Sequence, residues 1–242
     1  MTEALLTVSG LGKRFGGFVA LADIELEVQK GERLGLIGPN GSGKSTLVNC
    51  LCGTLRNDSG SVRFNGKSLD GLKAHERTRL GVARSFQLPR PFGTLTLAEN
   101  LRIPLLYVVR LRKAVPDIDR RCIDLLDLVG LADKAGHLPA DLTQIEMRKL
   151  ELARAMAAEP SLLIADEAMA GLSNREVDEI LALLMRLNEE QGVTIVMIEH
   201  IMRAVMHFSQ RLVVLVAGRK IADGDPADVV RQDDVVAAYL GS

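Results

Sequence analysis

The chain has 242 residues, of which 47% are hydrophobic and 25% are charged, enough to bury a substantial core in one compact α/β domain. Thirty basic and 31 acidic residues leave a formal charge of −1, so we expect no nucleic-acid partner. The N-terminus lacks a basic start followed by a long apolar stretch, and no apolar run approaches the ~20 residues that span a bilayer. We therefore expect a cytosolic chain whose membrane role comes through a partner. Three cysteines, Cys50, Cys52 and Cys122, lack metal-ligand spacing and are expected to pack in the core.

The first third of the chain has the patterns of β-strands. LLTVSGL (5–11), IELEVQ (24–29) and SVRFNGKSL (61–69) alternate or are β-rich, and Asn65-Gly66 predicts a hairpin turn. RLGLIG (33–38) is an apolar run that ends in glycine, directly before a stretch with a helical pattern, KSTLVNCLCGTL (44–55). These segments predict a strand followed by a helix.

The middle of the chain, from about 97 to 158, is predicted to be helical without a strand of its own. Asp117 can cap a helix that Gly130 ends, and one face of that helix carries Ile118, Cys122, Leu125, Leu126 and Val129. A second helix over 146–160 is expected to end at Pro160.

From residue 161 onward, strands and helices alternate. SLLIADE (161–167), VTIVMIEH (193–200) and RLVVLVAG (211–218) are predicted strands, and Ser173 and Glu176 have capping-box spacing before a helix over 175–192. Such alternation is typical of a parallel sheet covered by helices. The helical middle is then an insertion into a sheet domain.

A glycine-rich segment between a predicted strand and a predicted helix matches the phosphate-binding pattern G-x-x-x-x-G-K-[ST]. Its glycines let the backbone N–H groups and the helix N-terminus face negative charge. Lys44 is expected to reach the β and γ phosphates, Ser45 to bind Mg²⁺, and Thr46 to lie near the base-proximal phosphate. The full set of expected nucleotide-binding residues here is Gly38, Pro39, Asn40, Gly41, Ser42, Gly43, Lys44, Ser45 and Thr46.

Acidic residues follow the strand over 161–165. The carboxyl ends of parallel strands face the crevice where such sheets bind ligands, so Asp166 can hold Mg²⁺ through water and Glu167 can orient or deprotonate an attacking water. His200 follows the strand over 193–198 and is expected at the same edge, beside Glu199.

The order of these features resembles that of an ABC ATPase. The resemblance comprises Phe15 at the adenine-stacking position, GPNGSGKST, Gln87 at the Q-loop, the helical insertion, LLIADE and His200 as the switch histidine. It implies an α/β P-loop (RecA-like) fold with a mostly parallel sheet, an N-terminal antiparallel β subdomain and an inserted helical subdomain. Residues 1–86 and 159–242 would form the nucleotide-binding core with the β subdomain, and residues 87–158 the Q-loop and helical subdomain. Catalytic roles fall to Glu167, His200 and Gln87, and Gln87 joins Ser45 and Asp166 as a metal ligand.

The segments ARSFQ, EHIMRAVM and GDPADVV…AAYLG look most like ATP-binding subunits of branched-chain amino acid importers, although importers of urea, aromatic acids and amides share them. The resemblance implies a head-to-tail dimer with two ATP molecules between its subunits, transmembrane permease subunits, and indirectly a solute-binding protein. The chain would then lie on the inner face of the cell membrane.

The family signature, usually LSGGQ, is here Leu142-Thr143-Gln144-Ile145-Glu146. Thr143 can replace the serine hydroxyl toward nucleotide, whereas Ile145 stands where glycine allows close approach to a γ-phosphate. Thr143 and Glu146 also have capping-box spacing, which would turn the carboxylate back onto its own helix. We therefore expect a weakened site on the neighbouring subunit, which favours a heterodimer with a second ATPase over a homodimer.

Two alternative functions remain open from the sequence. One is a soluble ABC ATPase without a permease, which normally has two ATPase halves or a long coiled coil. The other is a nucleotide-binding regulator with weak hydrolysis, which the altered signature favours and the intact Lys44, Asp166, Glu167 and His200 oppose.

Overall fold

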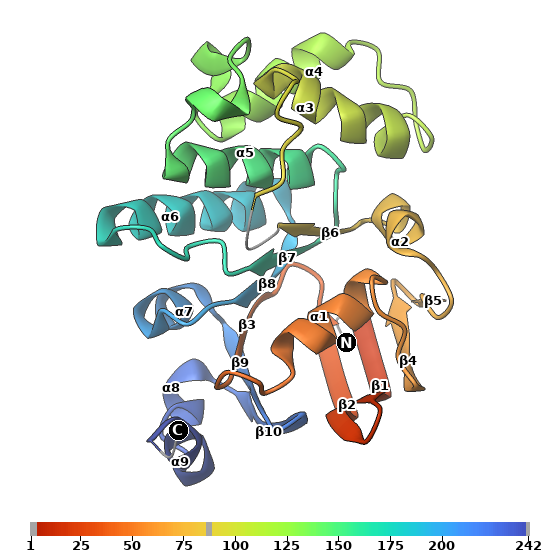
Figure 1. The fold of residues 1–242 in the computed structure, drawn as a ribbon, viewed down its shortest axis with the longest axis vertical. Coiled ribbons are helices and arrows are strands. Elements are labelled where there is room, and N and C mark those ends of the chain that lie inside the picture. The colour runs from red at the N-terminus through yellow and green to blue at the C-terminus, as the bar shows by residue number, and fades with distance from the viewer. Residues whose placement is uncertain (1–3, 86–88, 241–242) are drawn as a thin grey trace.

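The computed structural model describes residues 4–85 and 89–240, and within these ranges the chain forms two β-sheets with helices around them (Figure 1). The six-stranded sheet has the order β10-β9-β3-β8-β7-β6, in which β10 alone is antiparallel. Its strands are β3 (Arg33–Ile37), β6 (Val82–Ser85), β7 (Leu162–Asp166), β8 (Thr194–Ile198), β9 (Arg211–Val216) and β10 (Arg219–Gly224). The expected mostly parallel sheet is confirmed.

An antiparallel sheet is formed by the N-terminal part of the chain, as expected. Its order is β2-β1-β4-β5, with β1 (Ala4–Phe15), β2 (Phe18–Gln29), β4 (Ser59–Phe64) and β5 (Lys67–Ser68). The predicted hairpin turn at Asn65-Gly66 joins β4 to β5, and both residues have positive φ. Strands β1 and β2 are each 12 residues long, longer than the sequence patterns predicted.

The central strands are apolar on both faces because each face contacts a different layer. Leu163 and Ala165 of β7 belong to a cluster that includes residues of helices α4 to α7, whereas Leu162 and Ile164 belong to a cluster with α1 and the antiparallel sheet. Alternate residues of one strand therefore fill two cores. Around the sheet lie α1 (Lys44–Cys52), α2 (Ala74–Leu80), α6 (Asn174–Gln191), α7 (Met202–Phe208), α8 (Pro226–Val229) and α9 (Asp233–Leu240).

The helical middle lies between β6 and β7 in the chain and at the top of the view in Figure 1. It contains α3 (Leu97–Pro104), a π-helical turn at Leu105–Val109, α4 (Ile118–Leu128), 3₁₀ turns at Ala132–Lys134 and Pro139–Asp141, and α5 (Gln144–Met156). Asp117 caps α4 through the backbone N–H of Arg120 at 2.8 Å.

Two sequence predictions about helix ends have different outcomes. Ser173 caps α6 as predicted, with Glu176 completing the capping box. Helix α5 ends at Met156 rather than at Pro160. The residue before a proline is disfavoured in the α region, and Glu159 takes a φ of +48° in the tight turn that follows the helix.

Cys50 and Cys122 are buried in two different apolar clusters, and Cys52 is partly buried. Burial raises the pKa of the Cys50 and Cys122 thiols to about 11 and that of Cys52 to about 12. Within residues 4–85 and 89–240, no group of three or more His, Cys, Asp or Glu side chains is placed to hold a metal ion. The helices of these same ranges are all too short or too polar to cross a bilayer.

Candidate active site

Strand register brings the phosphate-type loop and the residues that follow β7 and β8 to one edge of the six-stranded sheet. Ile198, the last residue of β8, pairs with Asp166 of β7, and Leu36 of β3 pairs with Ile198 on the other side. The residues that follow these strands, including Gly38, Glu167 and Glu199, therefore emerge at the same edge. This is where open parallel sheets bind ligands.

The glycine-rich segment over 38–43 forms the loop between β3 and α1, and its backbone requires glycine. Gly38 has a φ of +154°, and a Cβ there would lie 2.1 Å from the carbonyl oxygen of Leu215. Gly43, the N-cap of α1, has a φ of +103°. The backbone N–H groups at the start of α1 present a partial positive charge toward the loop, and no acid in the first turn of α1 offsets this charge. This geometry suits a phosphate group.

Lys44 lies inside this loop. Its Nζ donates to the carbonyl oxygens of Gly38 at 2.6 Å and Pro39 at 3.0 Å. Burial lowers the pKa of Lys44, while the negative charges of Glu167 and Asp166 act in the opposite direction. The structure thus places this cation in the phosphate-type loop, within electrostatic range of the two predicted acids.

Glu167 and His200 form a direct contact, which we call the Glu167–His200 pair. His200 Nε2 lies 2.7 Å from Glu167 Oε1, and the two residues follow the adjacent strands β7 and β8. Glu167 has a φ of +49°, a conformation that few residues other than glycine and asparagine adopt. Its side chain is partly exposed, so it can accept a hydrogen bond from a water.

Asp166 is buried and paired with a residue that the sequence analysis missed. Arg84 of β6 donates from Nη2 to Asp166 Oδ2 at 2.5 Å and from Nη1 to Asn49 Oδ1 of α1 at 2.7 Å. The available signal was a charged residue in the strand VARS, but Arg84 and Asp166 are 82 positions apart in the chain. The pairing depends on β6 lying beside β7.

The start of helix α5 has the predicted capping box. The Thr143 hydroxyl accepts from Glu146 N, and Glu146 Oε2 accepts from Thr143 N at 3.0 Å. Lys134 donates to Glu146 Oε1 at 2.6 Å, and these hydrogen bonds lower the Glu146 pKa, the bond from Lys134 most. Ile145 packs against the apolar cluster of the helical middle. The altered signature residues therefore have structural roles within their own subunit.

The remaining predicted residues are placed as follows. Ser45 and Thr46 lie in the first turn of α1. Phe15 ends β1 with half of its side chain exposed, and the Lys13 ammonium lies 5.7 Å from its ring centroid. Gln87 lies outside the described residues. Sequence analysis gave no role to Glu199, which is buried and accepts a hydrogen bond from the backbone N–H of Met169 at 2.9 Å.

Comparisons with known proteins agree with this geometry. The family model described as "ABC transporter" matches residues 21–170, and one described as "Branched-chain amino acid ATP-binding cassette transporter" matches residues 219–242. The chain is 36% identical over 253 aligned positions to the high-affinity branched-chain amino acid transport ATP-binding proteins LivG of Escherichia coli and BraF of Pseudomonas aeruginosa. Each alignment covers 100% of this chain and 99% of the relative.

Among solved structures, the ADP conformation of MJ1267, an ATP-binding cassette of an ABC transporter, is similar over 100% of both chains. Its TM-score is 0.89 at 30% sequence identity. A nucleotide-free ATP-binding cassette from an ABC transporter has a TM-score of 0.88 at 29% identity, covering 99% of this chain and 100% of that one. The two matches therefore cover both nucleotide-free and ADP-bound forms of one fold.

Proposed function

Because the chain belongs to the ABC transporter family of ATP-binding, ATP-hydrolysing proteins, we propose that it powers a membrane importer for branched-chain amino acids or similar small amides and acids. The match of residues 219–242 to a branched-chain amino acid transporter model supports this solute class. The observation on which the proposal chiefly depends is the joint position of Lys44, Asp166 and the Glu167–His200 pair at one sheet edge.

ATP hydrolysis follows from these side chains in a simple sequence. The loop amides over 38–43 and the N-terminus of α1 receive the phosphates, and Lys44 exchanges its carbonyl partners for β and γ phosphate oxygens. Glu167 orients the attacking water and accepts its proton, while His200 fixes the carboxylate at Oε1. Phe15 stacks on the adenine, and Thr46 contacts the base-proximal phosphate.

The oxygen donors at this edge fit Mg²⁺. Ser45 offers a hydroxyl at the start of α1, and Asp166 offers a buried carboxylate, which are ligands that Mg²⁺ accepts alongside water and phosphate. We propose that these two residues and Gln87 would hold the ion, which would neutralise negative charge on the phosphates. Arg84 orients the Asp166 carboxylate for this task.

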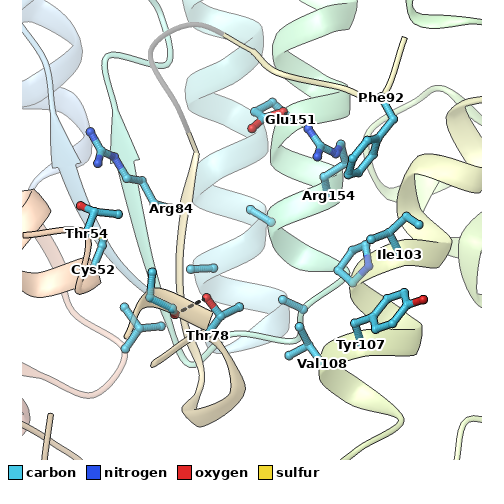
Figure 2. Close-up of a pocket in the computed structure, with 16 residues that line it drawn as sticks. Cys52, Thr54, Thr78, Arg84, Phe92, Ile103, Tyr107, Val108, Glu151 and Arg154 are labelled. Atoms are coloured by element: carbon cyan, nitrogen blue, oxygen red, sulfur yellow. Dashed lines mark hydrogen bonds and ion pairs between the residues drawn. The ribbon is translucent and has the colours of Figure 1, made fainter. Parts of the chain in front are cut away.

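A pocket between the sheet domain and the helical middle supports docking of a permease. Its volume is about 320 Å³, and its lining includes Arg84, Phe92, Tyr107 and Arg154. In Figure 2, Arg84 and Cys52 lie on one side, and Phe92 and Arg154 lie across from them, next to Ile103 and Tyr107. Tyr107 is 65% exposed and Phe92 45%. Exposed aromatic side chains around a concave surface are typical of binding sites for another protein.

The assembly follows from the docking site and the signature. The chain would lie on the inner face of the membrane, beside permease subunits that receive cargo from a solute-binding protein. Residues 1–86 with 159–242 would form the nucleotide-binding core, and residues 87–158, which begin with Gln87, would form the helical subdomain. Since Ile145 and Glu146 have roles within their own subunit, a second ATPase with an unaltered signature is the favoured dimer partner.

The test is to purify the protein from detergent-solubilised membranes and identify what is attached to it. Recovery of integral membrane subunits and a second ATPase supports the proposal. Recovery of the chain alone, or with nucleic acid, contradicts it. A transport assay with radiolabelled leucine and, separately, a short-chain amide then distinguishes the solute classes.

A further inference from the structure

Two buried residues with ionisable side chains contact the same short turn. The turn over residues 168–172 follows Glu167 and leads to α6. Glu199, only 3% exposed, accepts from the backbone N–H of Met169 at 2.9 Å. Arg148, only 7% exposed, donates from Nη2 to the carbonyl oxygen of Ala170 at 3.1 Å. Buried charges are costly, so such residues normally have a specific task.

These residues connect the turn to two different parts of the site. Arg148 lies on α5, five positions after its N-cap Thr143. Glu199 directly precedes His200 in the chain, just after the end of β8. The turn therefore has one attachment to the start of α5 and another to the strand end that presents His200.

A third contact places the start of α5 against the same turn. Gln144 Nε2 lies 3.5 Å from the carbonyl oxygen of Ala170, and a Cβ on Gly171 would lie 2.7 Å from that amide nitrogen. Arg148 also interacts electrostatically with Glu199, Glu151 and Glu167. Charge and packing thus tie α5, the turn and the Glu167–His200 pair together.

The backbone of Glu167 explains why the turn needs this support. Its φ of +49° is unfavourable for glutamate, and such conformations persist only where the surrounding structure holds them. If the turn were released, Glu167 would relax toward negative φ, and its carboxylate would leave the 2.7 Å contact with His200.

We propose that Arg148 and Glu199 are positioning residues for ATP hydrolysis, which hold the turn 168–172 so that the Glu167–His200 pair stays aligned. This role rests on the proposed ATP hydrolysis and does not depend on the partner or the solute.

The test compares ATP turnover, KM and equilibrium ATP binding in the complex purified from membranes. Glu199→Ala removes the acceptor of the Met169 N–H, and Arg148→Met removes the donor to Ala170. Each is expected to lower kcat about 10- to 100-fold, the scale of a small misalignment of reacting groups, with KM and ATP affinity within about 3-fold of wild type. Glu199→Gln keeps an oxygen acceptor and should restore kcat to within about 3-fold.

Controls separate positioning from general damage. Lys149→Met alters the neighbouring residue of α5, whose ion pair with Glu179 is partly exposed, and should leave kcat unchanged. Lys44→Ala sets the background rate. A wild-type complex no faster than this background contradicts the proposed function. If the wild-type complex turns over ATP faster than this background, two results would overturn the positioning role. One is that Glu199→Ala and Arg148→Met have the wild-type kcat, and the other is that they lose ATP affinity while kcat is unchanged. If Glu199→Ala fails to fold, the kcat of Arg148→Met compared with that of Lys149→Met tests the positioning role.

Discussion

The charge on Glu146 leads to our most specific prediction, which concerns its partner Lys134. The Lys134 ammonium lies 2.6 Å from Glu146 Oε1, at the helix start expected to face the nucleotide of a neighbouring subunit. Lys134→Ala would leave a carboxylate without that counter-charge near a phosphate. The mutation should therefore slow ATP turnover even though Lys134 itself touches no nucleotide.

The size of the effect follows from Coulomb's law. A carboxylate about 4 Å from a phosphate oxygen is repelled by ~4 kcal/mol per charge pair at an effective dielectric of 20, and by ~1 kcal/mol in bulk water. The Lys134 and Glu146 side chains are 29% and 20% exposed, so a value of about 1 to 2 kcal/mol is appropriate. Such a penalty corresponds to a fall in turnover of roughly 5- to 30-fold.

The assay is steady-state ATP hydrolysis by the assembled complex with single and double substitutions. Lys134→Ala should lose activity, and Lys134→Ala with Glu146→Gln should recover to within about 3-fold of wild type because the uncovered charge is gone. Lys113→Ala is the matched control, since its 2.7 Å ion pair is with Glu159, which follows the end of α5, far along the helix from its start. Wild-type activity in Lys134→Ala, or no recovery in the double variant, would refute the electrostatic reasoning.

Three further predictions concern the sheet edge. Lys44→Ala should abolish detectable ATP binding in a fluorescent-nucleotide titration, because no other described side chain in this loop has a positive charge. Unchanged binding would show that this loop does not bind the nucleotide. Glu167→Gln should bind ATP normally but lower turnover, measured by phosphate release, at least about 100-fold. An equal loss from the same change in a second ATPase subunit would argue against functional asymmetry between the two ATP sites of the dimer. Burial raises the pKa of Glu199 from 4.5 to about 7. Between these pH values the folded state keeps a proton on Glu199 that the unfolded state has lost, so the free energy of unfolding should fall as pH rises from 4.5 to about 7. In urea titrations, Glu199→Gln should flatten this pH dependence and raise the free energy of unfolding at pH 8 by about 2 to 3 kcal/mol. If the variant and the wild type have parallel pH profiles, Glu199 does not titrate in this window.

Features encoded by neighbouring residues could be predicted from the sequence. The phosphate loop is one, because its glycines, Lys44 and the helix start are contiguous and the backbone geometry is local. The capping boxes at Thr143 and Ser173 are others, since both partners lie within four residues. Apolar strands such as β7, all of whose residues are buried, were also predicted correctly because burial on both faces leaves little choice of residue.

Features that depend on distant residues could not be predicted. Strand β6 has only four residues, and its Arg84 gains a role only from Asp166, 82 positions away. Glu199 resembles an ordinary acid until β8 ends beside the turn that holds Met169. Helices α2, α8 and α9 also went unpredicted; they have four to eight residues, too few to show a clear period.

The left-handed backbone of Glu167 has a consequence for how this protein changes over generations. Asparagine adopts a φ near +49° far more readily than glutamate, so Glu167→Asn would relieve strain of about 1 kcal/mol while removing the proposed proton acceptor. The backbone conformation therefore does not favour glutamate at this position. Homologues that no longer need to hydrolyse ATP should therefore replace this glutamate early. A homologue that keeps it is expected to have retained ATP hydrolysis.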